Sequence, residues 1–246
     1  MARPKKSVID GIKTIVWFNF VTQTTGINPN RLQRELNKST QSGHDSHKCY
    51  RWKNGSRTPN KINVAEIEKL APNASWQFYH PLWDILKNPS AIVTLVDIER
   101  LLFQLPYPEL ILFKRADGDQ DKLVRVSRPL DLSAADALRY NNTFFQYFFV
   151  QEYENLDLMA AYFILAREAQ ILGSHSGLVI ALTLYEESKP LIEKIPELKG
   201  VTELLFKFIE NSSEWNYPEP EEKLYRDVLM KKIQLVSDKY VNPPDQ

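Results

Sequence analysis

Four side chains that can bind a metal ion stand close together in the chain: His44, Asp45, His47 and Cys49. Imidazole and thiolate are preferred zinc ligands, but structural zinc sites usually draw two pairs of ligands from separated segments. The chain has 4 histidines and 1 cysteine, and no second pair of such residues follows this cluster. We therefore expect a polar loop with a buried cysteine and no bound metal.

Two further patterns place catalytic or cation-binding residue types together, but each has the wrong residue at a required position. Residues 173–177 are Gly-Ser-His-Ser-Gly, whereas a nucleophile elbow needs serine at the central position. Asp117, Asp119 and Asp121 alternate as in a calcium-binding loop, but Arg128 occupies the position that requires a bidentate glutamate. We expect a turn between helices at the first pattern and a solvated tip at the second. The sequence predicts no catalytic site and no cofactor.

Basic side chains are concentrated near the N-terminus, where they fit the binding of a polyanion. Residues 1–75 contain 13 Lys or Arg against 5 Asp or Glu, and residues 76–246 contain 18 against 26. Lysine and arginine contact phosphates and also bind guanine edges. The candidates for contact with nucleic acid are Arg31, Arg34, Lys38, Lys48, Arg51, Lys53 and Arg57. This asymmetry indicates a nucleic-acid-binding module joined to an acidic remainder.

The most informative motif is the segment from Trp52 to Pro59, which reads Trp-Lys-Asn-Gly-Ser-Arg-Thr-Pro. A short helix over residues 48–54 is expected before it. A buried tryptophan would anchor this helix, Gly55 would turn the chain sharply, and the remaining side chains would stay at the surface. We expect Trp52, like Trp17, to lie in the core and not to stack on bases.

This segment resembles the recognition helix and following turn of Cro/C1-type helix-turn-helix proteins, over about 45 residues from Ile27 to Leu70. In that family the helix that enters the major groove often ends in an aromatic or aliphatic anchor residue, which is followed by a glycine and then by a proline before the next helix. The resemblance implies duplex DNA as the partner. The loop from Ser39 to His47 departs from the family, whose turn is only a few residues long. The layout also resembles uncharacterised bacterial proteins that carry an early Trp-Phe, which implies no function.

Helices predicted from the hydrophobic pattern would position these residues. Residues 7–23 are apolar on most sides, so this helix must bury most of its surface, and Gly26 ends it. Asn28 and Pro29 are the expected N-cap and first residue of a helix over residues 29–38. The leucines of that helix share one face and its basic residues another.

A helix from Asn63 to Leu70 should follow, with Val64, Ile67 and Leu70 inward. The sequence of residues 76–246 predicts a larger helical domain. Residues 154–172 are expected to form its central helix because they are apolar on most sides. Further helices are expected over residues 90–104, 133–151, 176–194, 197–211 and 219–240. Two runs of β-type residues, 109–115 and 122–127, predict a β-hairpin.

The expected fold is mainly α, with a helix-turn-helix-like module over residues 1–75 and an acidic helical domain over residues 76–246. The single cysteine excludes an internal disulfide, and the N-terminus lacks the apolar run of a secretory signal. No stretch approaches the about 20 apolar residues of a membrane span. These features predict a cytoplasmic protein without a membrane segment.

Our leading hypothesis is a regulatory DNA-binding protein that is not an enzyme. Its acidic domain would mediate homo-oligomer formation or receive a signal from a protein partner or a ligand. The alternative is an intracellular interaction adaptor without nucleic-acid binding, whose basic module docks an acidic partner or its own acidic domain. An enzyme with an unrecognised helical active site is the third hypothesis.

Overall fold

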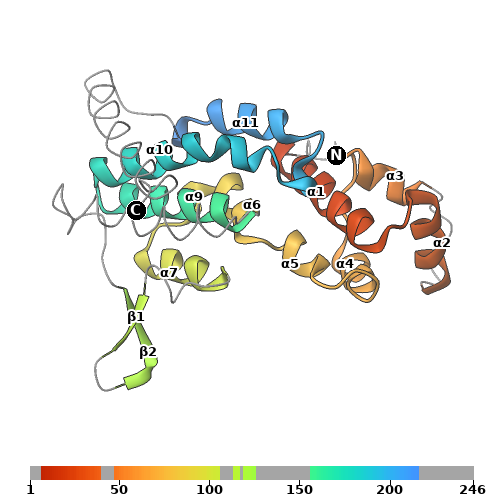
Figure 1. Cartoon of the computed structure of the whole chain (residues 1–246), viewed down its shortest axis with the longest axis horizontal. Coiled ribbons are helices and arrows are strands. Elements are labelled where there is room, and N and C mark those ends of the chain that lie inside the picture. The colour runs from red at the N-terminus through yellow and green to blue at the C-terminus, as the bar shows by residue number, and fades with distance from the viewer. Residues whose placement is uncertain (1–6, 40–46, 106–112, 117–118, 126–155, 216–246) are drawn as a thin grey trace, which may run out of the picture. The chain divides into compact units, whose positions relative to one another are not determined.

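The computed structural model describes residues 7–39, 47–105, 113–116, 119–125 and 156–215, which are mainly helical (Figure 1). None of the helices in these ranges has both the length and the apolar character needed to cross a bilayer. The helices predicted over residues 133–151 and 219–240 lie outside the described residues, and so does the side chain of Lys38.

The chain divides into two compact units. The first, which we call the N-terminal unit, comprises Met1–Lys87 together with Leu191–Ser213. The second unit comprises Asn88–Pro190 and Glu214–Gln246. The N-terminal unit thus combines two segments that lie far apart in the sequence.

Helix α1 (Val8–Thr25) is the central element of the N-terminal unit. It packs against short helices that follow it in the chain, and also against elements that arrive much later. These neighbours are α3 (Lys48–Lys53), α5 (Ala74–Phe78), α6 (Pro81–Lys87), the 3-10 turn η4 (Pro196–Leu198) and α11 (Thr202–Glu210). Apolar residues around most of α1 suit this position, as its sequence predicts. Gly26, with a φ of 63°, ends the helix at the expected residue.

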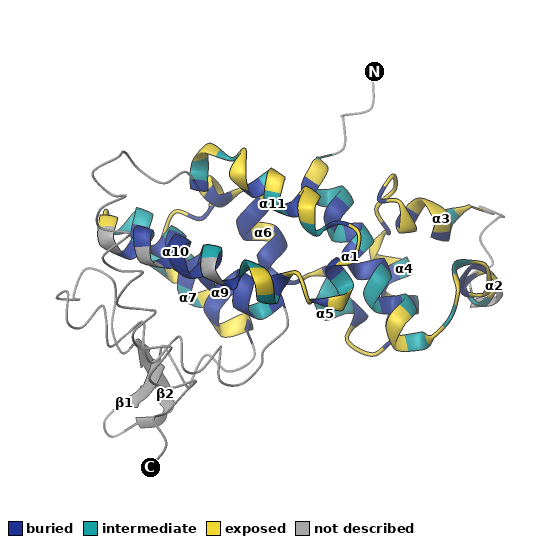
Figure 2. Cartoon of the chain, turned by 45° about the horizontal axis from the view of Figure 1, so that its top comes forward, coloured by how far each residue is buried: buried dark blue, intermediate teal, exposed yellow. Residues whose placement is uncertain are grey.

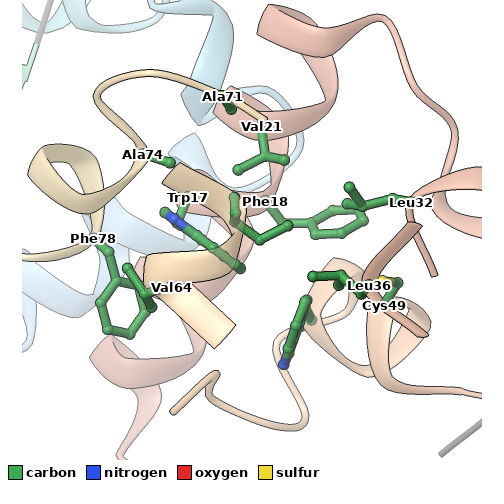
Figure 3. Close-up of a cluster of buried hydrophobic side chains, with 12 residues drawn as sticks. Trp17, Phe18, Val21, Leu32, Leu36, Cys49, Val64, Ala71, Ala74 and Phe78 are labelled. Carbon is green, nitrogen blue, oxygen red and sulfur yellow. The ribbon is translucent and has the colours of Figure 1, made fainter. Parts of the chain in front are cut away.

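The remaining helices of the N-terminal unit complete a single hydrophobic cluster with α1 (Figure 3). Helix α2 (Pro29–Ser39) and helix α4 (Lys61–Glu68) contribute leucine, valine and isoleucine side chains. The cluster consists of Trp17, Phe18, Val21, Leu32, Leu36, Cys49, Trp52, Val64, Ile67, Ala71, Ala74 and Phe78. The rings of Trp17 and Trp52 meet edge to face, with centroids 5.4 Å apart. The prediction that both tryptophans lie in the core is confirmed.

The sequence prediction was wrong at the end of α4. The helix stops at Glu68, so Leu70 no longer follows the inward stripe of Val64 and Ile67, and 40% of its surface is exposed. Ala71 is buried instead. The chain turns away two residues earlier than the hydrophobic spacing indicates.

The second unit is built around helix α9 (Leu156–Ile171), which is buried on nearly every side, as its apolar composition predicts (Figure 2). Helix α7 (Leu95–Gln104) packs against it. Helix α10 (His175–Ile192) contributes Tyr185, whose ring lies 4.8 Å from that of Phe163 on α9. The ring of Trp215, in the 3-10 turn η5 (Ser213–Trp215), lies 5.0 Å from that of Phe163, and the 3-10 turn η1 (Pro89–Ala91) belongs to the same unit.

Strands β1 (Phe113–Ala116) and β2 (Asp119–Arg125) pair in an antiparallel two-stranded sheet. Lys114 lies opposite Val124, and the register shifts between Arg115 and Ala116. The sheet lies in the segment for which the sequence predicts a hairpin.

The inclusion of Leu191–Ser213 in the N-terminal unit differs from the division predicted at residue 75. Helix α1 packs against η4 and α11 of this segment, and two of its amide side chains also bind the backbone of the segment. Asn19 Nδ2 donates to the carbonyl oxygens of Glu197 and Lys199, at 2.9 and 3.1 Å. Gln23 Nε2 donates to the carbonyl oxygen of Pro196 at 2.9 Å. Independent folding of residues 1–75 and 76–246 stays a prediction.

Candidate nucleic-acid interface

Helix α2 presents two different faces, as its residue spacing predicts. Asn28 Oδ1 accepts a hydrogen bond from the Arg31 amide at 3.0 Å, which confirms the expected N-cap ahead of Pro29. Leu32 and Leu36 are buried in the core cluster. Arg31 and Arg34 are exposed. The apolar face therefore fixes the helix, and both arginines face solvent.

Helix α3 is anchored by Cys49 and Trp52, which are fully buried. Arg51 and Lys53, on either side of the tryptophan, are exposed. This agrees with the prediction that an inward Trp52 leaves its two neighbours at the surface, because successive helical residues point about 100° apart. Sequence reasoning did not single out Tyr50, whose exposed fraction is 42%.

Lys48 is held within the protein. Its side chain is half-buried, and its Nζ donates to Asn63 Oδ1 at 3.0 Å and lies 5.6 Å from the centroid of the Trp52 ring. Asn63 in turn donates from its backbone and side-chain nitrogens to Asn60 Oδ1, the N-cap of α4. Lys48 thus joins α3 to α4.

The turn after α3 has the conformation that the glycine and proline predict. Gly55 adopts a φ of 68°, and its amide donates to the Trp52 carbonyl at 3.0 Å. The Arg57 amide donates back to the Arg51 carbonyl at 3.2 Å, which curls the turn against the end of the helix. Pro59 is buried and Arg57 is exposed. The turn therefore carries its arginine at the surface beside α3.

Gln33 links α2 to α3 directly, and sequence reasoning missed it. Only 7% of the residue's surface is exposed. Oε1 accepts a hydrogen bond from the Cys49 amide at 3.0 Å, and Nε2 donates to Asn37 Oδ1 at 2.9 Å. The sequence feature that could have identified Gln33 is its position beside Leu36 on the helical wheel, which places a glutamine at the edge of the apolar face.

Cys49 is fully buried, and its environment favours the protonated thiol. Burial raises the pKa of its thiol to about 12, while the nearby Lys48 acts in the opposite direction. The thiolate, which is the nucleophilic and metal-binding form, is therefore scarce at neutral pH. Within the described ranges, no group of three or more His, Cys, Asp or Glu residues could hold a metal ion. His44 and Asp45 lie outside those ranges.

The structure brings most of the predicted contact residues to two neighbouring helices. Helices α2 and α3 pack against each other (Figures 1 and 2). The exposed members of the set are Arg31, Arg34, Arg51, Lys53 and Arg57. We call these five residues the basic surface. No protein-family model, curated protein or solved structure matches the chain.

Proposed function

We propose that the N-terminal unit binds duplex DNA through α2, α3 and the turn after α3, and that the protein is a regulatory DNA-binding protein. The observation that carries the proposal is the basic surface. Four of its five cationic side chains lie on α2 and α3, which pack against each other and share one core, and the fifth, Arg57, lies in the turn after α3. The packing of α2 on α3 also supports the resemblance to helix-turn-helix proteins.

The energetic basis of this proposal is the release of counterions from DNA. Each phosphate neutralised by lysine or arginine releases condensed cations, so affinity falls as salt rises, with a slope of about −0.9 per phosphate on a log-log plot. Five contacts predict a slope of about −4 to −5. Trp52 and Gln33 hold α3 in place before binding, which limits the ordering cost of association.

The test is the binding of the full chain to a random-sequence duplex, measured by fluorescence anisotropy from about 50 to 200 mM salt. We expect Arg31→Ala and Arg34→Ala each to reduce the slope by about 1. Lys207→Ala is the matched control, because it removes an exposed cation from α11 of the same unit, where Lys207 pairs with Glu203 at 2.8 Å. The slope of this control should stay unchanged.

Absence of duplex binding at about 50 mM salt would contradict the proposal. If the chain then bound an acidic peptide instead, with loss of binding in Arg31→Ala, the interaction adaptor would be the better function. That outcome is physically reasonable because the same cations attract any polyanion.

The regulatory part of the proposal concerns the acidic remainder. Residues 76–246 carry 26 Asp or Glu against 18 Lys or Arg, so their charge disfavours a second contact with DNA. We assign self-association or the reception of a signal to this part. Sedimentation of the full chain over a range of concentrations tests self-association. A monomer at every concentration would exclude self-association and leave the reception of a signal as the role of this part.

A further inference from the structure

Tyr50 lies at the centre of the outward face of α3. Trp52 is fully buried and therefore marks the inward direction of this helix. At about 100° per residue, Arg51 and Lys53 point about 100° to either side of it, whereas Tyr50 points about 160° away. The exposed fraction of Tyr50, 42%, agrees with this placement.

Asn54 points outward at a similar angle, but its side chain is engaged within the turn. It is the C-cap residue of α3, and its Oδ1 accepts a hydrogen bond from the Ser56 amide at 3.1 Å. An asparagine that binds adenine needs both its carbonyl and its amino group at the base edge. Asn54 cannot offer that pair in this conformation, so Tyr50 is the outward residue best placed for a base.

We propose that Tyr50 determines sequence specificity, by contacting a thymine in the major groove while Arg51 and Lys53 contact phosphates on the two sides of it. This inference rests on the proposed function. The major groove is about 12 Å wide, so a helix that presents its outward face to the bases turns its flanks toward the two backbones. The resemblance to helix-turn-helix proteins leaves open which residues of α3 contact bases, and the geometry assigns that role to Tyr50.

Thymine is the base that the chemistry of tyrosine favours here. The aromatic ring offers apolar surface to the C5 methyl group, which only thymine presents in the major groove. The hydroxyl group can donate to or accept from a neighbouring base edge. An arginine or lysine at the same position would favour guanine instead.

Tyr50 can be varied without disturbing the position of α3. The helix is held by Cys49 and Trp52 in the core, by Gln33 at its first turn, and by Lys48 toward α4. Substitutions at exposed positions away from such features change stability little. Tyr50→Ala should therefore melt at nearly the same temperature as the wild type, which makes a loss of binding interpretable.

The experiment begins with a selection of preferred duplexes from a randomised library by the full chain. The dissociation constants of the wild type, Tyr50→Ala, Tyr50→Phe and Lys53→Ala are then measured for a selected duplex and for a random one. Tyr50→Ala should weaken binding to the selected duplex about tenfold or more, with the random duplex and the salt slope unchanged. Lys53→Ala should weaken both equally and reduce the slope by about 1. Tyr50→Phe should keep the preference.

A change in the DNA tests the thymine contact itself. Replacement of each thymine in the selected site by deoxyuridine removes only the C5 methyl group. At one position this should weaken binding by the wild type and leave Tyr50→Ala unaffected, because the partner of the methyl group is already absent.

Three results would overturn the inference, and each differs from failure of the proposed function, in which no duplex binds at all. The first is an unchanged preference in Tyr50→Ala. The second is equal weakening for selected and random duplexes. The third is a larger loss for single-stranded oligo-dT than for duplex, which would assign the ring to base stacking on single strands.

Discussion

Gly55 allows the backbone of the turn after α3 to lie against the backbone of α1. A Cβ atom at this position would come within 2.8 Å of the Gly11 carbonyl oxygen and 3.0 Å of Ile15 Cδ1. The φ of Gly55 is also positive, at 68°. Gly26 has a similar φ of 63°, with no atom within 4 Å of its hypothetical Cβ. A comparison of substitutions at the two glycines therefore separates the effect of backbone strain from the effect of steric overlap.

We expect Gly55→Ala to destabilise the protein more than Gly26→Ala. Both substitutions place a side chain in the left-handed region, at a cost of about 1–2 kcal/mol. Only Gly55→Ala adds overlap with α1, which costs a further amount of about 1–3 kcal/mol. Chemical denaturation of the full chain measures both. Equal losses would show that the turn shifts away from α1 without cost.

The same contact predicts a different result from the α1 side. A Cβ at Gly11 would lie 3.6 Å from the Gly55 carbonyl oxygen, which is an ordinary van der Waals distance. Alanine is favoured over glycine within a helix by about 1 kcal/mol. Gly11→Ala should therefore be neutral or stabilising in the same denaturation experiment, and a large loss would show that α1 and the turn are packed more tightly than these distances indicate.

Glu68 predicts a dependence of stability on pH. Partial burial acts to raise the pKa of this carboxyl, but hydrogen bonds from the Ser75 and Asn73 amides at the start of α5 outweigh it, so the pKa is lowered. A group with a lowered pKa contributes stability above its unfolded pKa and loses that contribution as the pH falls through the folded value.

Glu68→Gln should therefore unfold more easily than the wild type at pH 7, by about 0.5–1 kcal/mol, because it removes a charge from a helix N-terminus. As the pH falls through the lowered pKa of the folded carboxyl, the wild type becomes protonated and the difference should shrink. Urea denaturation at about pH 7 and about pH 3 measures it. If the free energies of unfolding of the two proteins differed by the same amount at both pH values, the effect would come from hydrogen-bond geometry and not from charge.

At the scale of elements, Gln33 makes α2 and α3 one unit despite the intervening residues 40–46. The Cys49 amide belongs to the first turn of α3, where amides have no partner within the helix, and Gln33 Oε1 satisfies it in the core. Gln33→Leu should cost about 1–3 kcal/mol, because it leaves that amide buried without its acceptor.

Asn37→Ala is the matched control for Gln33→Leu. It removes the other hydrogen-bond partner of Gln33, but Asn37 is exposed, so the loss should stay within about 0.5 kcal/mol. Thermal melting of both variants makes the comparison. A larger loss of melting temperature in Asn37→Ala than in Gln33→Leu would contradict this prediction. It would show that the hydrogen bond between Gln33 and Asn37 contributes more to stability than the one between Gln33 and the Cys49 amide.

Helices α1 and α2 could be predicted because their signals are local. Apolar spacing, the Asn28 cap and the Gly26 stop all lie within the element that they define. The bonds from Gln33 to Cys49 and from Lys48 to Asn63 join residues 16 and 15 positions apart, across segments without a regular period. No pattern within either helix predicts such a partner. The bond of Lys48 shows this limit, since the charge of Lys48 is visible in the sequence and its partner Asn63 is not.

At the scale of the whole molecule, the segment from residue 191 to 213 shows why the predicted boundary differs from the observed division. Its own sequence resembles that of any surface helix, with Leu205 and Ile209 inward and charged residues outward. Its packing partner, α1, lies far away in the chain. The apolar residues around α1 indicated that something covers each side of it, but they could not indicate which later segment does so.

This division predicts how the chain behaves when it is cut. Hydrogen exchange should show protected amides in α11 of the full chain, because Leu205 and Ile209 are buried and α1 packs against this helix. In a fragment of residues 76–246 that support is missing. Exchange in α11 should become about tenfold faster or more, whereas α9, which packs on α7 within the second unit, should keep its protection.

A single substitution in the full chain tests the same contact without truncation. Asn19→Asp replaces the amide that donates to the carbonyl oxygens of Glu197 and Lys199 by a carboxylate, which cannot donate and is repelled by both oxygens. Exchange in α11 should accelerate in this variant too. Asn37→Asp is the control, because it makes the same charge change at an exposed residue of α2, where Asn37 Oδ1 accepts a hydrogen bond from Gln33 Nε2 that a carboxylate oxygen can also accept. If α11 stayed equally protected in the fragment and in Asn19→Asp, its stability would come from neighbours other than α1, and the division at residue 75 would be a true domain boundary.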